Sequence, residues 1–250
     1  MKYNKSDLDY LKKYIKENNL DDNYYNESLK KLEEGLPIQY IIGNVNFYSN
    51  IIKVNKSVLI PRFETELLVD LSIKKIKDIF KNDKVDILDL GTGSGCIAIS
   101  LKKEINSNVD AVDISKEAIK VAKQNALDNK VDINFINQDM VNYTEKKYDV
   151  IVSNPPYIRY DEEIMDIVKY NEPHLALYAE DNGLYFYKNI IKNIQYITKE
   201  KFLVCFEIGY EQANNIVDIA QTYLDNINIS IEKDYSGKDR FIFITNEPKY

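Results

Sequence analysis

A glycine-rich turn between an apolar strand and a helix-compatible segment constrains the possible fold more than any other feature of this chain. Residues 85–90 form a largely apolar, β-branched run, and residues 96–100 suit a helix. The turn between them consists of Gly91, Thr92, Gly93, Ser94 and Gly95. Glycines adopt positive φ and let the backbone approach a ligand closely. A strand, a glycine loop and a helix in this order predict an α/β fold that binds a nucleotide-like ligand at the loop.

A second apolar strand ends in Asp113, eighteen residues after Gly95. A carboxylate at this spacing can accept hydrogen bonds from both hydroxyls of an adenosine ribose. The alternative is that Asp113 caps the helix that begins near Ser115. The glycines follow the pattern Gly-x-Gly-x-Gly and not Gly-x-Gly-x-x-Gly, which favours a ligand without a pyrophosphate.

The residues Asn154, Pro155, Pro156 and Tyr157 follow the apolar run 148–153 and offer a grip for a planar amino group. Proline cannot continue a strand ladder, so this segment is a stiff turn. The Asn154 Oδ1 can accept one N–H, a prolyl carbonyl, with Pro155 favoured, can accept the other, and the Tyr157 ring can cover the flat face. An ordinary strand-ending turn is the alternative. Combined with the glycine loop and Asp113, the segment indicates transfer of a group to a planar nitrogen.

Strands and helices alternate along the chain. We expect strands at residues 85–90, 109–113, 132–136, 148–153, 202–207, 227–231 and 241–245, with helices near 64–80, 115–129, 184–198 and 210–223. This alternation predicts a doubly wound, mostly parallel sheet with helices on both faces. Ligands bind such sheets at the carboxyl ends of the strands, so one edge should gather the glycine turn, Asp113, Asp139, Met140 and Asn154.

Several segments resemble a known family. Residues 89–98 and 154–157 resemble S-adenosylmethionine-dependent methyltransferases that modify planar nitrogens. Residues 35–43 with Phe47-Tyr48, and Val-Leu-Ile-Pro-Arg-Phe-Glu-Thr-Glu at 58–66, narrow this to the release factor glutamine methyltransferase family, with Phe63 where a second proline is usual. Residues 172–177, 183–184, 207–212 and 234–240 are similar to the same family in the same order.

The resemblance implies methyl transfer from S-adenosylmethionine to the side-chain amide nitrogen of a glutamine, in the Gly-Gly-Gln motif of peptide chain release factors, without a metal or a covalent nucleophile. It assigns cofactor binding to Gly91, Thr92, Gly93, Ser94, Gly95, Asp113, Asp139, Met140 and Asn154. It assigns catalysis to Asn154, Pro155 and Tyr157, and substrate binding to these three and Pro156. Asp139 would accept from the adenine amine and Met140 would pack on its ring. A turn or cap for Asp139 and ordinary core packing for Met140 are the alternatives.

The resemblance also predicts the domain organisation. Residues 1–43 are expected to be a short helical substrate-docking domain of two helices, near 7–17 with Ser6 as its N-cap and near 22–34. Residues 45–48 and 51–54, joined by Ser49 and Asn50, predict a β-hairpin within a linker at 44–60. Residues 61–250 form the methyltransferase domain, in which the family implies seven strands with the last antiparallel. Family members usually begin with a larger helical domain, so the helical domain of this chain is expected to be a shortened one.

Two other activities stay open from the residues. A glutamine methyltransferase for a large-subunit ribosomal protein shares the Asn-Pro-Pro-Tyr sequence, and a nucleic-acid adenine amino-methyltransferase would use the same grip on a flipped base. The net charge of −7 weakens the nucleic-acid alternative, because phosphate contacts require basic surface. Near the predicted site, Glu172 is the stronger candidate for organising it, and we expect a structural or surface role for His174.

Composition bounds the remaining properties. The chain of 250 residues is 44% hydrophobic, and it contains neither a long apolar run nor a signal-peptide pattern at its start. Its two cysteines fall in predicted core segments and form neither a disulfide framework nor a metal set. We therefore expect a cytoplasmic, monomeric enzyme without a membrane segment and without stable nucleic-acid binding.

Overall fold

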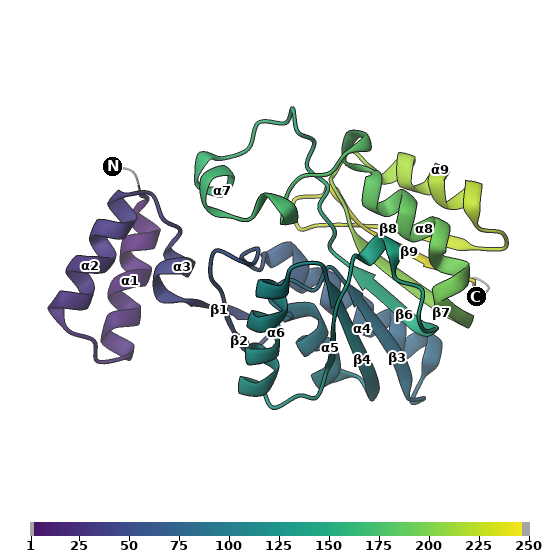
Figure 1. Cartoon of the computed structure of the whole chain (residues 1–250), viewed down its shortest axis with the longest axis horizontal. Coiled ribbons are helices and arrows are strands. Elements are labelled where there is room, and N and C mark those ends of the chain that lie inside the picture. The colour runs from purple at the N-terminus through teal and green to yellow at the C-terminus, as the bar shows by residue number, and fades with distance from the viewer. Residues whose placement is uncertain (1–2, 247–250) are drawn as a thin grey trace.

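The computed structural model describes residues 3–246 as a small helical lobe and a larger α/β lobe (Figure 1). Helices α1 (Lys5–Glu17), α2 (Asp22–Glu33) and α3 (Ile38–Ile42) form the small lobe, drawn in purple. The antiparallel strands β1 (Asn44–Phe47) and β2 (Asn50–Lys53) lie between the lobes. The predicted hairpin is confirmed, but its turn lies one residue earlier, at Tyr48 and Ser49, because both adopt the positive φ (46° and 61°) that a tight hairpin needs.

Two expectations for the small lobe were wrong. It contains a third helix, α3, because Pro37 precedes a new helical turn and Gly43 ends it with a φ of 84°. The N-cap of α1 is Asn4, whose side chain accepts from the Asp7 N–H at 2.8 Å, while the predicted cap Ser6 donates its hydroxyl to Asn4.

The small lobe has a hydrophobic core of its own, formed by Leu11, Leu32, Ile38 and Ile42. We therefore propose the limits 1–43, 44–60 and 61–250 as the domain organisation of the chain. No helix within residues 3–246 combines the length and the apolar character that crossing a membrane requires.

The larger lobe is built on a sheet of seven strands with the order β5-β4-β3-β6-β7-β9-β8. Its members are β3 (Val85–Leu90), β4 (Ser107–Asp113), β5 (Asn134–Asn137), β6 (Tyr148–Ser153), β7 (Thr198–Glu207), β8 (Asn228–Lys233) and β9 (Asp239–Thr245). β9 runs antiparallel to both of its neighbours, and the other pairings are parallel. The predicted doubly wound, mostly parallel fold with a reversed last strand is confirmed. The chain order reverses between β3 and β6, which is where such sheets bind ligands.

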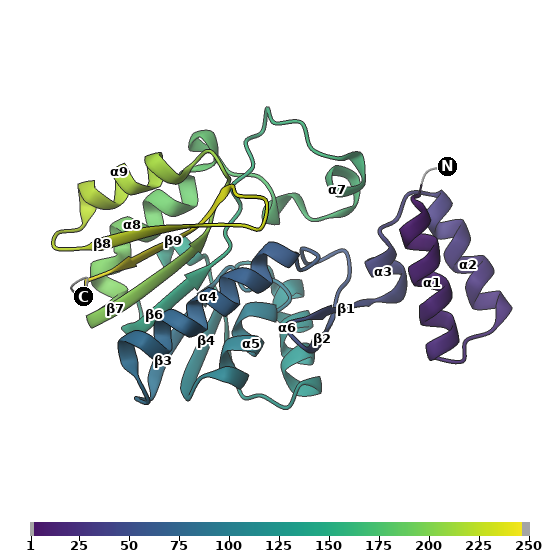
Figure 2. The ribbon, with the colours of Figure 1, turned by 180° about the vertical axis from the view of Figure 1, so that it is seen from behind.

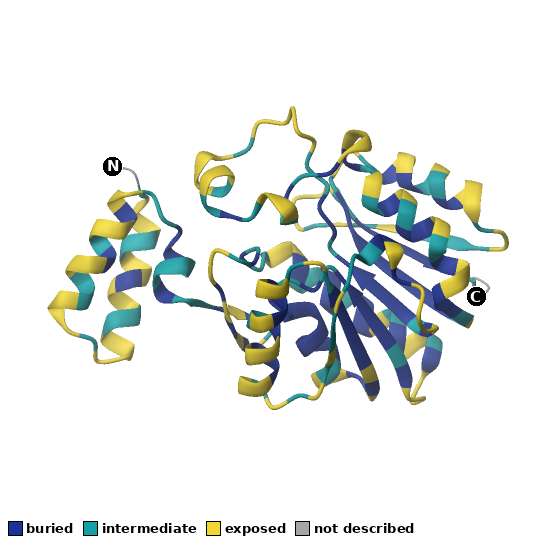
Figure 3. Cartoon of the chain, in the orientation of Figure 1, coloured by how far each residue is buried: buried dark blue, intermediate teal, exposed yellow. Residues whose placement is uncertain are grey.

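Helices cover both faces of the sheet (Figure 2). Those on one face are α4 (Phe63–Phe80), α5 (Cys96–Glu104) and α6 (Lys116–Asp128), and those on the other are α8 (Tyr185–Ile197) and α9 (Ala213–Tyr223). Successive strand residues point to opposite faces, so Ile87 belongs to the core under α4 and α5, and Leu88 to the core under α8 and α9. Strands β3, β4, β6, β7 and β9 are accordingly buried along most of their length, whereas the edge strands β5 and β8 contain no buried residue (Figure 3).

The remaining short elements lie in loops beside the sheet edge. They are α7 (Asp166–Asn171) and the 3-10 turns η1 (Met140–Asn142), η2 (His174–Ala176) and η3 (Asp181–Gly183).

Cys96 and Cys205 are both buried and free, as predicted, and burial raises the pKa of each thiol to about 12.

Candidate active site

The glycine turn connects β3 to α5 at the point where the order of the strands reverses. The backbone N–H groups of Gly91 and Thr92 both donate to the Val112 carbonyl, at 2.9 and 3.0 Å. Gly91 has a φ of 76°, and a Cβ added there would lie 2.9 Å from the Met140 Cε. A side chain at Gly91 would therefore be strained, and the end of the Met140 side chain would have to move to admit it.

Asp89, the penultimate residue of β3, binds the glycine turn and the start of α5 through hydrogen bonds. Its Oδ2 accepts from the Thr92 hydroxyl at 2.6 Å and from the Ala98 N–H at 3.2 Å. The carboxyl group is fully buried, and burial raises its pKa to about 7. Asp89 thus joins the start of α5 to the strand before it.

Asp113 ends β4 beside the turn. Its Oδ2 accepts from the Gly93 N–H and its Oδ1 from the Ser115 N–H, each at 2.8 Å. The side chain that caps α6 is Ser115, whose hydroxyl accepts from the Ala118 N–H at 3.2 Å. Burial raises the pKa of Asp113, and these two backbone hydrogen bonds act in the opposite direction. The carboxylate is therefore held in one orientation beside the glycine turn.

Asp139 and Met140 lie after β5. Asp139 caps η1, because its Oδ1 accepts from the Val141 N–H at 3.1 Å. The alternative considered from the sequence, a turn cap, is thus present in the structure, and Asp139 also lines a cavity.

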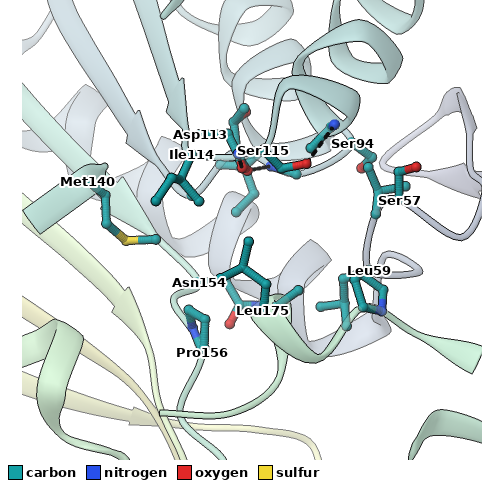
Figure 4. Close-up of a pocket in the computed structure, with 18 of the residues that line it drawn as sticks. Ser57, Leu59, Ser94, Asp113, Ile114, Ser115, Met140, Asn154, Pro156 and Leu175 are labelled. Carbon is teal, nitrogen blue, oxygen red and sulfur yellow. Dashed lines mark hydrogen bonds between the residues drawn. The ribbon is translucent and has the colours of Figure 1, made fainter. Parts of the chain in front are cut away.

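This first cavity, of about 290 Å³, lies between the glycine turn and the loop after β6 (Figure 4). The predicted site residues that line it are Gly91, Thr92, Gly93, Ser94, Asp113, Asp139, Met140, Asn154 and Pro156. In Figure 4, Asp113 and Ser115 lie across it from Asn154 and Pro156. Gly95 is not among the lining residues: it precedes α5 and packs against Ala122 instead.

A second cavity, of about 350 Å³, lies on the other side of the segment Asn154–Tyr157. Pro155 and Tyr157 line this second cavity, Pro156 lines the first, and Asn154 lines both. The other residues around it include Leu59, Arg62, Ile158, Ile164, Met165 and Val168. The four-residue segment therefore lies between two cavities, and within it Asn154 is the residue that lines both, as Leu59 and Ala176 also do.

Three residues that hold this segment belong to the stretches that carry the family resemblance, but our sequence analysis assigned them no role in the site. The Asn154 Nδ2 donates to the Thr65 hydroxyl at 3.1 Å, and that hydroxyl donates to the Glu207 Oε2 at 2.7 Å. The Gln212 Nε2 donates to the Tyr157 carbonyl at 3.0 Å. The available signal was an acidic residue at the end of an apolar strand, residues 202–207, because a carboxylate buried there needs partners.

Glu172 and His174 behave differently. Glu172 is only 4% exposed and accepts from the Ile60 N–H at 3.0 Å and the Arg62 Nη2 at 2.6 Å. It therefore ties the loop after α7 to the segment before α4, which borders both cavities. His174 is exposed, its Nε2 lies 2.8 Å from the Lys169 carbonyl, and it lines neither cavity.

The fold and the arrangement of the glycine turn, Asp113 and Asn154 define a class I methyltransferase. The methyltransferase small domain family matches residues 65–172. A release factor glutamine methyltransferase from Bacillus subtilis is 42% identical over 217 residues, covering 84% of this chain and 75% of the relative. One from Fusobacterium nucleatum is 41% identical over 251 residues, covering 97% of this chain and 69% of the relative. The chain belongs to the release factor glutamine methyltransferase family.

Solved structures support the fold. A ribosomal protein L11 methylase from Lactobacillus delbrueckii is similar with a TM-score of 0.53 at 22% identity, over 73% of this chain and 77% of that one. A methyltransferase from Pyrococcus furiosus is similar with a TM-score of 0.57 at 18% identity, over 78% and 87% of the two chains.

Proposed function

We propose that this chain transfers a methyl group from S-adenosylmethionine to the side-chain amide nitrogen of a glutamine in peptide chain release factors, within their Gly-Gly-Gln motif. The observation that carries the proposal is the position of Asn154 between two cavities, one beside the glycine turn and one beside Pro155 and Tyr157. A transferase needs such an arrangement, because donor and acceptor must meet at one point from two sides. The names of the relatives support release factors as the substrate.

The first cavity fits S-adenosylmethionine. Each carboxylate oxygen of Asp113 accepts one backbone N–H and keeps capacity for a further hydrogen, as two ribose hydroxyls require. Asp139 would accept from the adenine amine, with Met140 against the ring. When bound, the cofactor supplies a methyl group that the positive charge of its sulfonium has already activated.

The second cavity would receive the glutamine side chain. Asn154 Nδ2 is engaged by Thr65, and no donor from residues 3–246 reaches its Oδ1, which is the acceptor for one amide hydrogen of the substrate. The Pro155 carbonyl would accept the other, and the Tyr157 ring would cover the amide plane. As the nitrogen gains positive charge these acceptors interact more strongly, so they stabilise the transition state more than the bound substrate. The proton then leaves the nitrogen for water.

One experiment separates this activity from its alternatives. The protein is incubated with isotope-labelled S-adenosylmethionine and, separately, with a release factor, large-subunit ribosomal proteins and DNA, and the labelled atom is located by mass spectrometry. We expect label on the glutamine amide of the release factor and none on a matched release factor in which that glutamine is alanine. Label on a ribosomal protein or on adenine, with none on the release factor, would overturn the proposal.

We also propose that the chain acts as a monomer and does not bind nucleic acid stably. The net charge of −7 supports the second statement, because tight binding to phosphates requires basic surface. Light scattering with and without DNA measures the molar mass of the protein and tests both statements. The mass of a dimer would contradict the first, and the mass of a protein–DNA complex would contradict the second.

A further inference from the structure

A buried chain of hydrogen bonds ends at the side chain of Asn154. Glu207, at the carboxyl end of β7, accepts from the Thr65 hydroxyl at 2.7 Å, and Thr65, in the first turn of α4, accepts from Asn154 at 3.1 Å. Glu207 is 2% exposed and Thr65 is 3% exposed. These three residues come from a strand, a helix and a loop, and solvent reaches the first two only slightly.

A hydroxyl has one hydrogen to donate, and an ionised carboxylate can only accept. Because Glu207 takes the hydrogen of Thr65, the oxygen of Thr65 is left as an acceptor. The group of Asn154 that faces Thr65 must then be its NH2, and its carbonyl oxygen must face away. The orientation of an amide is normally assigned from its network, and here the network permits one orientation.

We propose, on the basis of the function proposed above, that Thr65 and Glu207 are positioning residues that set the Asn154 amide with its oxygen toward the substrate. The reverse orientation would present a donor to the glutamine NH2, which is itself a donor, and the substrate would not be held. Whether Asn154 presents an acceptor or a donor to the substrate thus depends on the carboxylate of Glu207, which lines neither cavity.

The charge on Glu207 decides in which direction the hydrogen bonds from Asn154 through Thr65 to Glu207 are donated. A protonated Glu207 can donate to Thr65, which can then donate to the Asn154 oxygen and so reverse the amide. The titratable groups that face Glu207 are Glu64 from α4, Arg240 from β9, Tyr187 from α8, Tyr157 from the loop after β6 and Cys96 from α5. Burial raises the pKa of Glu207 to about 7, the charge of Glu64 acts in the same direction, and the hydrogen bonds from Thr65 and Asn154 and the charge of Arg240 oppose this shift.

The test compares three variants with the wild-type chain. Thr65→Val keeps the shape but removes the hydroxyl, Thr65→Ser restores it, and Glu207→Gln removes the charge. Ser72→Ala is the control, because Ser72 is a buried hydroxyl on the same helix that lines neither cavity. The measurements are the dissociation constant of S-adenosylmethionine, the single-turnover rate with saturating release factor on both sides of neutral pH, and the nuclear Overhauser contact between the Asn154 side-chain NH2 and the Thr65 side chain.

We expect Thr65→Val to lower the single-turnover rate about tenfold or more with cofactor affinity unchanged, because one hydrogen bond is worth about that factor. Thr65→Ser recovers most of the rate, and Ser72→Ala matches the wild type. Glu207→Gln is slower and loses the rise of rate with pH through neutrality. In the Asn154→Ala background, Thr65→Val causes no further loss, since both changes remove the same grip.

The proposal is overturned if Thr65→Val turns over within about twofold of the wild type, or if its loss adds fully to that of Asn154→Ala. If Thr65→Val fails to fold, Glu207→Gln decides alone, and an unchanged pH profile contradicts the proposal. A wild-type chain that does not methylate the release factor refutes the proposed function only. In that case the nuclear Overhauser contact between the Asn154 NH2 and Thr65 still tests the proposed orientation of the amide. The absence of this contact would overturn that orientation.

Discussion

The Nε2 of Gln212 donates to the backbone carbonyl of Tyr157 at 3.0 Å, although the two residues are 55 positions apart in the chain. The same side chain accepts from the Gly209 N–H through its Oε1 at 3.0 Å. Gln212 thereby fixes the far end of the Asn154–Tyr157 segment to the turn after β7. The near end is fixed through Thr65 and Glu207, so both ends of the segment are anchored to the carboxyl end of β7.

Gly183→Ala should destabilise the protein by disturbing this anchor. Gly183 has a φ of 82°, and an added Cβ would collide with the Tyr157 carbonyl oxygen and the Gln212 Nε2. Gly237→Ala is the matched control, because Gly237 has a φ of 78° and nothing within 4 Å of its Cβ position. Both variants carry a left-handed backbone cost of about 1–2 kcal/mol, and Gly183→Ala should lose about 1–3 kcal/mol more. Urea unfolding measures the free energy of unfolding of both variants. Equal losses of this free energy would contradict the predicted collision at Gly183.

Asn154→Ala should lower the single-turnover rate by about 10²–10³-fold, the usual cost of removing one acceptor or donor from a transition-state site. Affinity for S-adenosylmethionine should change little, because Asp113 and the glycine turn remain. Calorimetric titration and rapid-quench kinetics measure the two quantities. Asn189→Ala, which removes an amide that lines neither cavity, is the control. A near-normal rate in Asn154→Ala would rule out the proposed role.

Asp113→Asn should weaken cofactor binding by about tenfold or more, because it replaces one carboxylate oxygen by a donor. That NH2 must face either the Gly93 N–H or the Ser115 N–H, both of which are donors. The rate at saturating cofactor should fall much less than the affinity. Asp132→Asn, an exposed carboxyl beyond α6, is the control for the lost charge. Unchanged affinity in Asp113→Asn would show that this carboxylate does not bind the ribose.

Stability should fall as the pH rises toward and through neutrality. Burial raises the pKa of Glu207 from 4.5 to about 7, so between these values the folded chain holds a proton that the unfolded chain has released. The stabilisation from this group is complete below 4.5 and is lost as the pH rises through about 7. Glu207→Gln should flatten the dependence of the unfolding free energy on pH. Part of the decrease in unfolding free energy with pH should persist in this variant, because burial raises the pKa of Asp89 to about 7 as well.

Chemical unfolding at several pH values measures this dependence. Glu207→Gln with Asp89→Asn should be flatter than either single variant. A wild-type stability that rises with pH from 4.5 to 7 would contradict the direction argued from these two buried groups.

Local sequence determined much of the fold and half of the site. The order of strand, glycine turn and helix at residues 85–104, and the prolines after β6, have their shape decided by φ restrictions and apolar periodicity within a few residues. Asp113, Asn154 and their neighbours could therefore be placed at one sheet edge, because the carboxyl ends of parallel strands meet there. Helix α3 escaped prediction, since Pro37 is compatible both with the end of one helix and with the start of the next.

Only the tertiary structure decided which partners orient those side chains. Thr65 lies 89 positions from Asn154 and 142 from Glu207, and no local pattern links residues so far apart. Their hydrogen bonds exist because α4 packs on the sheet beside β7 and brings a hydroxyl between a buried carboxylate and a loop amide. The sequence by itself placed Asn154 at the carboxyl ends of the strands, beside the glycine turn, where we propose that two ligands meet. The packing of distant elements decided which way its amide faces, because a buried carboxylate leaves its neighbours one arrangement of donors and acceptors.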